Sequence, residues 1–117
     1  LGPVEHDAIT ACTSHAPMLA ALAMALAAGE ILEAHPDLPM LSAGGFRDTT
    51  RTASNPPWLA ADVWANNREA IGAVLDRLIE KLDHLKKASP DEMLELAEKA
   101  KAARETILAE GPGRWKA

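Results

Sequence analysis

Residues 70–85 read AIGAVLDRLIEKLDHL, and this stretch decides the fold. Its large apolar residues recur in two series with a period of seven, namely Ile71, Leu78 and Leu85, and Leu75 and Leu82. An apolar repeat of this period forms a stripe along one side of an α-helix and packs against another helix. We therefore predict a long central helix whose stripe contacts a second helix, within the chain or in the partner of a homodimer.

Three further helices are predicted around this one, and no strand. The first covers residues 4–28, is bent or divided at Pro17 because proline lacks a backbone donor, and ends at Gly29, with residues 30–34 as a candidate for one further turn before His35 and Pro36. A shorter helix covers residues 46–53. The last helix follows the central one and opens with Ser89 as its cap, with Pro90, Asp91 and Glu92 in its first turn. The fold class is thus all-α, a helical bundle with a long central helix, and we expect an intertwined homodimer.

The length and composition agree with one soluble helical domain. The chain has 117 residues, of which 48% are apolar and only 3% aromatic. A core made mainly of Ala and Leu suits close-packed helices better than a β-sandwich. We expect the helical domain to span residues 1–110 and residues 111–117, which follow a Gly-Pro-Gly sequence, to form a frayed tail.

Charge and hydropathy exclude two classes of partner. The net charge is −5, and residues 1–46 contain no Lys or Arg, so the chain has no basic surface that would favour nucleic acid. The apolar run over residues 16–28 is shorter than the roughly 20 residues that a bilayer requires. We therefore predict no membrane partner and a cytoplasmic protein. The single cysteine, Cys12, lies in an apolar stretch and is predicted to be a buried, inert thiol.

The motifs of most enzyme classes are absent from the sequence. There is no Gly-x-Gly-x-x-Gly and no phosphate-binding loop. The histidines at positions 6, 15, 35 and 84 lack the spacing of metal ligands, so no metal is expected. Ser14 and His15 are adjacent and would point in different directions on a helix, which argues against a catalytic triad.

The stretch SAGGFRDTTR, residues 42–51, is the most informative for function. Its glycines allow close approach of a ligand to the backbone. Arg47 and Arg51 are four residues apart and share a helix face, so together they could grip a carboxylate. The alternative is that Asp48 and nearby acidic residues pair with both arginines on a solvated surface, and chemistry alone leaves both open.

Several segments, taken in order, resemble the C-terminal domain of the prephenate/arogenate dehydrogenase family. They cover about residues 6–107 and consist of His6-Asp7, Ser14-His15-Ala16-Pro17-Met18, Gly44-Gly45-Phe46-Arg47-Asp48-Thr49-Thr50-Arg51, Asn55-Pro56, Trp58, Trp64 and Asn67-Arg68-Glu69. Each motif alone is modestly specific, whereas the whole series in register is strong.

This resemblance implies a division of labour. In the family, a Rossmann domain binds NAD or NADP and supplies the catalytic histidine for oxidative decarboxylation in tyrosine biosynthesis. The helical domain supplies the dimer interface and one wall of the substrate cleft. Carried onto this sequence, the resemblance implies that Arg51 binds a substrate carboxylate, that His15 lies near the cleft, and that Gly44 and Asp48 shape and brace the loop. No catalytic or cofactor-binding residue is expected in this chain, and the Rossmann domain is expected to be absent from it.

One position departs from the family pattern and bears on the substrate. Many prephenate-using members carry a second histidine in the Ser-His-Leu-Pro-His motif, where this chain has Met18. Methionine cannot donate a hydrogen bond to an anionic oxygen. Arogenate, or a related cyclohexadienyl compound, therefore stands open beside prephenate as the substrate.

Three functions compete on the sequence. The first is the dimerising and substrate-binding half of an NAD(P)-dependent prephenate/arogenate dehydrogenase, inactive as an isolated chain. The second is a non-catalytic helical dimerisation or ligand-sensing module. The third, a small helical enzyme resembling chorismate mutase, is disfavoured because the basic residues after position 70 alternate with acidic ones, as on a solvated face.

Overall fold

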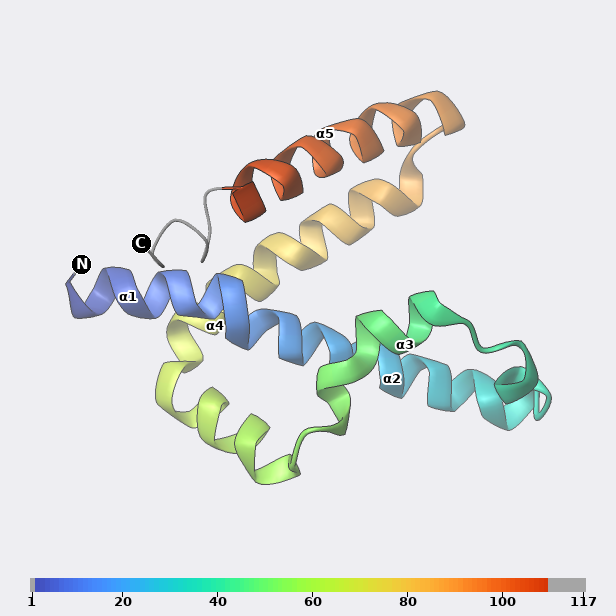
Figure 1. Cartoon of the computed structure of the whole chain (residues 1–117), viewed down its shortest axis with the longest axis horizontal. Helices are drawn as coiled ribbons and strands as arrows, with labels where there is room; N and C mark the ends of the chain where they lie inside the picture. The colour runs from blue at the N-terminus through green and yellow to red at the C-terminus, as the bar shows by residue number, and fades with distance from the viewer. Residues whose placement is uncertain (1, 110–117) are drawn as a thin grey trace. The chain divides into compact units, whose positions relative to one another are not determined.

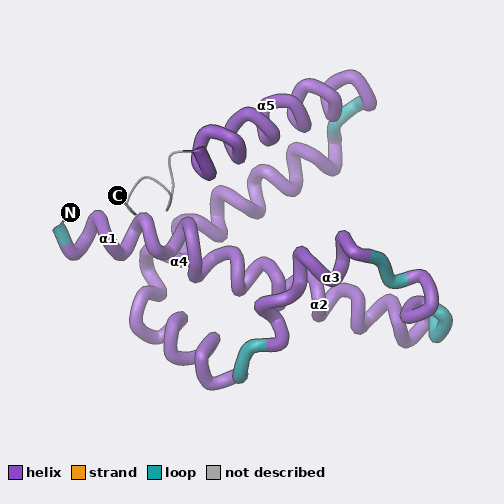
Figure 2. The backbone as a smooth tube through the Cα atoms, in the orientation of Figure 1, coloured by secondary structure: helices purple, strands orange, loops and turns teal. Residues whose placement is uncertain are grey.

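The computed structural model describes residues 2–109, which form helices and their connections without any strand (Figures 1 and 2). The predicted all-α class is therefore confirmed. The α-helices are α1 (Pro3–Thr10), α2 (Ala16–Ala34), α3 (Gly44–Thr50), α4 (Pro57–Lys87) and α5 (Pro90–Ala109). Three short segments join them: a π-helix, η1 (Ala11–His15), and two 3-10 helices, η2 (Leu38–Leu41) and η3 (Arg51–Ser54). The predicted frayed tail, residues 111–117, lies outside the described residues.

The chain forms two compact units that divide within α4. The first unit extends to Arg77, and the second begins at Leu78. The first unit contains every candidate site residue, whereas the second contains the end of α4 and α5.

The first helical run is longer than predicted. The elements α1, η1 and α2 follow one another without a break from Pro3 to Ala34, so the predicted end at Gly29 is wrong. The run ends instead at His35, whose φ of −133° and ψ of 80° are non-helical. The physical reason is Pro36, because a proline disfavours the α conformation of the residue before it.

The expected irregularity near Pro17 takes the form of the π-helix η1. Pro17 has no backbone N–H, so the carbonyl of Thr13 cannot receive the usual bond from the residue four positions later. Around it the ladder shifts, and the N–H of Ala16 bonds to the carbonyl of Ala11, five residues back. The helix therefore continues past the proline with one wider turn instead of breaking.

The core of the first unit consists mainly of small residues on one side of this helical run. α2 packs against η1, α3 and η3. The buried apolar residues of the described chain are Ala11, Ala16, Met18, Ala21, Ala28 and, from α4, Ile71. Small side chains allow neighbouring helices to approach closely, which explains why an Ala-rich sequence suits this arrangement.

The prediction of a buried Cys12 is wrong, because this thiol is exposed. Ala11 and Ala16 take the buried side of the π-helix, and the residues between them, Cys12, Thr13 and Ser14, face outward. Apolar surroundings in the sequence did not reveal the face, because the wider π turn shifts the helical phase.

The predicted long central helix is α4, with 31 residues. It contains one kink that the sequence did not indicate, at Asn67, whose φ of −138° and ψ of 32° are non-helical. Ile71 of the apolar stripe is fully buried in the first unit, but Leu82 is 55% and Leu85 is 36% exposed. The distal part of the stripe thus lacks a full partner within the described chain.

The second unit is a helical hairpin. α5 begins as predicted, because the Ser89 hydroxyl accepts a hydrogen bond of 3.2 Å from the backbone N–H of Glu92. Both arms of the hairpin carry large apolar side chains that remain exposed, namely Ile79, Leu82, Leu85, Met93, Leu94, Ile107 and Leu108. The hairpin therefore does not bury its own apolar surface.

The continuous helical run from Pro3 to Ala34 is longer than the apolar stretch considered in the sequence. Pro3–Ala34 forms 32 helical residues with a window of mean hydropathy 1.5, long and apolar enough to cross a membrane by length and composition. One such helix near the N-terminus is a weak indication, because core helices of soluble proteins and signal sequences pass the same test. The helix that contains residues 16–28 is thus longer than that apolar run, and the absence of a membrane partner stays a prediction.

Candidate functional site

Arg47 and Arg51 line one cleft. Arg47 lies in α3 and Arg51 begins η3, which continues directly from it. The cleft has a volume of about 380 Å³, and its lining comprises Ser42, Phe46, Arg47, Thr50, Arg51 and Ser54. Two arginines and two serines line the same space, and these are residue types that can bind a carboxylate ligand.

The local fold beneath this cleft is held by Thr50. Thr50 is buried although it is polar, and its hydroxyl donates a hydrogen bond to the backbone carbonyl of Phe46, one turn earlier. The bond satisfies the buried hydroxyl and ties the last turn of α3 to Phe46. The two arginines thus project from a braced turn.

Neither arginine pairs with an acidic side chain among residues 2–109. The ion pairs of the described chain join His6 to Asp7 and Lys87 to Asp83. Asp48 is exposed and does not line the cleft. Both arginines are exposed, as the alternative of a solvated surface expects, but neither forms an ion pair with Asp48 among residues 2–109.

Gly44, which was predicted to shape the loop of the binding site, lies outside the arginine cleft. Gly44 is the first residue of α3, after Ala43 in an extended conformation, and it does not line the arginine cleft. A Cβ atom added at Gly44 or Gly45 would meet no atom within 4 Å. The glycines are therefore not required by packing within the described chain, and the space beside them is open to a ligand or another chain.

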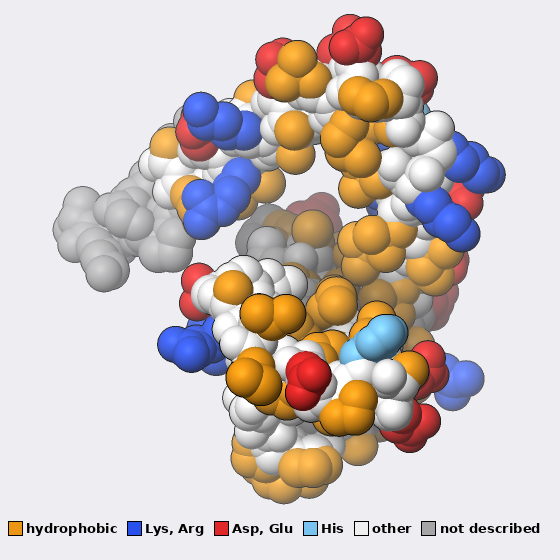
Figure 3. Space-filling view, turned by 90° about the vertical axis from the view of Figure 1, so that its right-hand side faces the viewer, with side chains coloured by type: hydrophobic (Ala, Val, Ile, Leu, Met, Phe, Trp, Pro, Cys, Tyr) orange, Lys and Arg blue, Asp and Glu red, His pale blue; other side chains and the backbone are white. Residues whose placement is uncertain are grey.

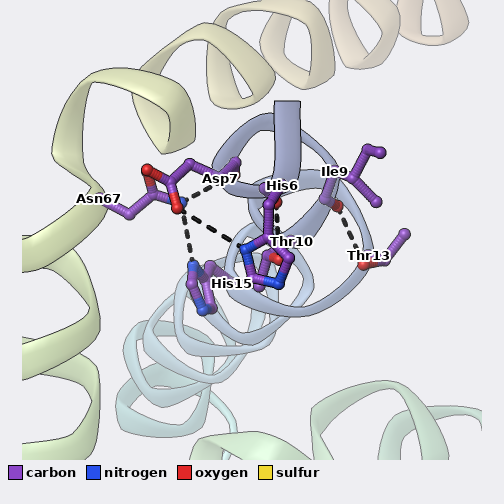
Figure 4. Close-up of polar contacts among 7 residues, drawn as sticks. All are labelled: His6, Asp7, Ile9, Thr10, Thr13, His15 and Asn67. Carbon is purple, nitrogen blue, oxygen red and sulfur yellow. Dashed lines mark hydrogen bonds and ion pairs between the residues drawn. The ribbon is translucent and has the colours of Figure 1, made fainter. Parts of the chain in front are cut away.

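His15 lies at the end of the π-helix and is half-buried. Its Nδ1 lies 3.3 Å from Nδ2 of Asn67, and the same Nδ2 donates a hydrogen bond of 2.9 Å to the backbone carbonyl of Asp7 (Figure 4). His15 does not line the arginine cleft. The described structure thus joins Arg51 with Arg47, whereas His15 is joined with Asn67.

Met18 lies one turn after His15 and also lies close to the segment that follows Arg51. It is buried, and its sulfur lies 3.9 Å from Nδ2 of Asn55. Met18 and Thr52, the neighbour of Arg51, line the same small cavity of about 240 Å³. The helix α2, which follows His15, therefore packs on the 3-10 helix that carries Arg51, and Met18 lies at this contact.

A larger apolar groove adjoins the arginine cleft and shares Ser42 and Phe46 with it. It has a volume of about 620 Å³ and lies between the end of α2 and the segment that leads into α3. Its other lining residues are Met24, Ala28, Ile31, His35, Asp37, Leu38, Leu41, Ala43 and Gly45. This groove was not predictable from the sequence, because its walls come from separate segments, and their packing on one another is a tertiary feature.

Comparison with known proteins agrees with the all-helical fold and the motif series. The family model described as "Prephenate dehydrogenase, dimerization domain" matches residues 2–101. The chain is 31% identical over 86 residues to the prephenate dehydrogenase of Bacillus subtilis, covering 74% of this chain and 23% of that protein. It is 35% identical over 85 residues to the cyclohexadienyl dehydrogenase of Zymomonas mobilis, covering 72% of this chain and 29% of that protein.

A solved structure extends the likeness to three dimensions. The crystal structure of Synechocystis arogenate dehydrogenase superposes with a TM-score of 0.74 at 25% identity, over 92% of this chain and 41% of that chain. The fold is that of an enzyme's helical dimerisation domain. The chain belongs to the prephenate dehydrogenase dimerization-domain family. It spans less than a third of the length of the curated relatives it matches.

Proposed function

We propose that this chain is the dimerising and substrate-binding domain of an NAD(P)-dependent prephenate/arogenate dehydrogenase, a cytoplasmic enzyme of tyrosine biosynthesis. The observation that carries the proposal is the cleft in which Arg47 and Arg51 lie without acidic partners among residues 2–109. Prephenate and arogenate are carboxylates, and paired guanidinium groups bind a carboxylate with directed, charge-assisted hydrogen bonds. Family membership supplies the reaction class.

In such an enzyme, we propose that a separate domain carries out the redox chemistry. A dinucleotide site needs a strand, a glycine-rich turn and a helix, whereas residues 2–109 contain no strand and the sequence has no Gly-x-Gly-x-x-Gly. The residues of this chain therefore do not fit NAD or NADP, and we assign no cofactor step to them. We propose that a Rossmann domain binds the cofactor and supplies the catalytic histidine, and that the isolated chain of 117 residues is inactive.

The second part of the proposal is a homodimer. Apolar side chains remain exposed on both arms of the second unit, and hydrophobic surface also appears among the charged side chains in Figure 3. Ile79, Leu82 and Leu94 are more than half exposed, although they belong to helices with regular apolar spacing. Large apolar side chains exposed in this number favour an interface, and a symmetric dimer would cover them on both copies.

The test of the carboxylate site is calorimetric titration of prephenate and of arogenate into the whole gene product, saturated with NAD or NADP. Arg51→Ala is expected to lose about 1.5–3 kcal/mol of binding free energy, roughly ten- to a hundredfold in Kd, because a hydrogen-bonded charge contact disappears. Arg51→Lys is expected to recover only part of the loss, since Lys does not form the bidentate contact.

Arg104→Ala is the matched control, because Arg104 is an exposed arginine of α5 outside the cleft. It should bind both compounds as the wild type does. Equal binding by wild type and Arg51→Ala would remove Arg51 from the substrate wall. Binding of neither compound by the wild type would instead favour a non-catalytic dimerisation or ligand-sensing module.

A further inference from the structure

Two helix irregularities in the first unit meet at one side chain. The π-helix Ala11–His15 interrupts the first helical run, and the kink at Asn67 interrupts α4. The amide of Asn67 reaches both sides of this junction, because it contacts the backbone of Asp7 and the ring of His15 (Figure 4). Departures from regular helical geometry of this kind are frequent at functional sites.

The orientation of the Asn67 amide follows from its partner in α1. A backbone carbonyl only accepts hydrogen bonds, so the atom of Asn67 that lies 2.9 Å from the Asp7 carbonyl must be the NH2 nitrogen and not the amide oxygen. Turning the amide over would place its oxygen against the Asp7 oxygen. The Asp7 carbonyl therefore determines which end of the amide faces His15.

The same nitrogen lies 3.3 Å from Nδ1 of His15. An NH2 group only donates, so Nδ1 must accept and cannot carry a proton while this contact exists. In a neutral imidazole the other ring nitrogen then carries the proton. The contact thus selects the tautomer in which Nε2 is the N–H donor, and Nδ1 faces Asn67.

We infer that Asn67 is a positioning residue that holds His15 as an Nε2–H donor for an oxygen of the substrate. The part of this inference that concerns substrate rests on the proposed function and on the family resemblance, which implies that His15 lies near the substrate cleft. The π-helix sets the position of the ring, and the Asp7–Asn67 bond sets the direction of its hydrogen bonds. An oxyanion or carbonyl oxygen needs a donor, and this arrangement supplies one without any acidic side chain in the network.

The tautomer can be measured without substrate. Solid-state 15N spectra of the whole gene product, labelled on histidine, distinguish a protonated Nε2 from a protonated Nδ1, at a pH of about 8 where imidazole is neutral. Comparison with His15→Gln assigns the signal. We expect wild-type His15 to be the Nε2–H tautomer, and a protonated Nδ1 in the wild type would overturn the inference.

Asn67→Asp tests the cause, because a carboxylate only accepts and therefore demands a proton on Nδ1. The variant is expected to shift His15 to the Nδ1–H tautomer. Asn66→Asp is the matched control, since the Asn66 amide instead donates to the carbonyl of Asp62 within its own helix at 2.8 Å, and it should leave the tautomer unchanged. An unchanged tautomer in Asn67→Asp would show that Asn67 does not determine it.

Substrate binding separates this inference from the proposed function. If both hold, Asn67→Asp weakens binding of prephenate or arogenate about tenfold relative to Asn66→Asp, as expected for one redirected hydrogen bond. A changed tautomer with unchanged binding would keep Asn67 as the residue that orients His15. The same result would remove His15 from the substrate wall.

Discussion

Met18 shows what a single residue of this chain contributes. Its side chain is 6% exposed and its sulfur lies beside the Asn55 amide, where α2 meets η3. In sequence it appeared as a departure that bears on substrate, whereas the structure places it inside the packing of the first unit. Arg47 and Arg51 were predicted to share the face of one helix over residues 46–53, but Thr50, with φ of −105° and ψ of 7°, ends α3 between them, and the two residues meet as lining residues of one cleft. His15 was predictable only through the family resemblance, and its partner Asn67 lies 52 residues away.

We expect Met18→Ala to lower the free energy of unfolding by about 2–5 kcal/mol, because it leaves a cavity at a buried contact between elements. Met18→Leu conserves most of the volume and should cost less than about 1.5 kcal/mol. Met40→Ala makes the same change at a side chain that is 81% exposed, and should stay within about 0.5 kcal/mol. Urea denaturation at fixed protein concentration measures all three. Equal losses for Met18→Ala and Met40→Ala would contradict the buried role of Met18.

At the scale of the elements, local signals predicted where helices begin better than where they end. Ser89 was predicted to cap α5, and the bond from the Glu92 amide confirms it. Gly29 was predicted to end a helix, yet the helix continues to Ala34 because no change of backbone conformation is imposed before Pro36. The kink at Asn67 had no local signal, since neither proline nor glycine lies there.

The hydrogen bond from the Glu92 amide to the Ser89 hydroxyl should contribute measurably to the stability of α5. Ser89→Ala is expected to destabilise α5 by about 1 kcal/mol, because an amide of the first turn loses its acceptor. Hydrogen exchange of the amide of Glu92 should accelerate accordingly. Ser14→Ala is the control, since Ser14 is an exposed serine within the helical run and not at its start; it should change amide exchange little. Equal exchange of the Glu92 amide in Ser89→Ala and wild type would show that the cap does not stabilise α5.

At the scale of the whole molecule, the exposed apolar residues favour a contact with a second chain. The heptad stripe of α4 was predicted to contact another helix, but only its beginning, at Ile71, is fully buried in the described chain. Leu82 belongs to the same stripe and is 55% exposed. The sequence alone could not say whether its partner helix belongs to the same chain, because a heptad pattern is satisfied equally by either.

We expect Leu82→Lys to weaken the proposed homodimer. Burying one Leu contributes about 1.5–3 kcal/mol, and a symmetric interface contains it twice, so the dissociation constant should rise at least a hundredfold. Glu80→Lys introduces the same side chain at an exposed polar position of the same helix and should leave the dimer intact. Sedimentation over a dilution series measures both. A monomeric wild type, or equal dissociation of both variants, would contradict the proposed interface.

The all-α class, the long helix α4 and the start of α5 were predictable from the sequence alone. These features depend on residues close in the chain, through helical periodicity, proline geometry and capping, so local pattern suffices. Only the tertiary structure decided that Cys12 is exposed, that Met18 is buried and that Asn67 joins Asp7 to His15. Those features depend on a π turn that shifts the helical phase and on contacts between residues as many as 60 positions apart, which no local pattern encodes.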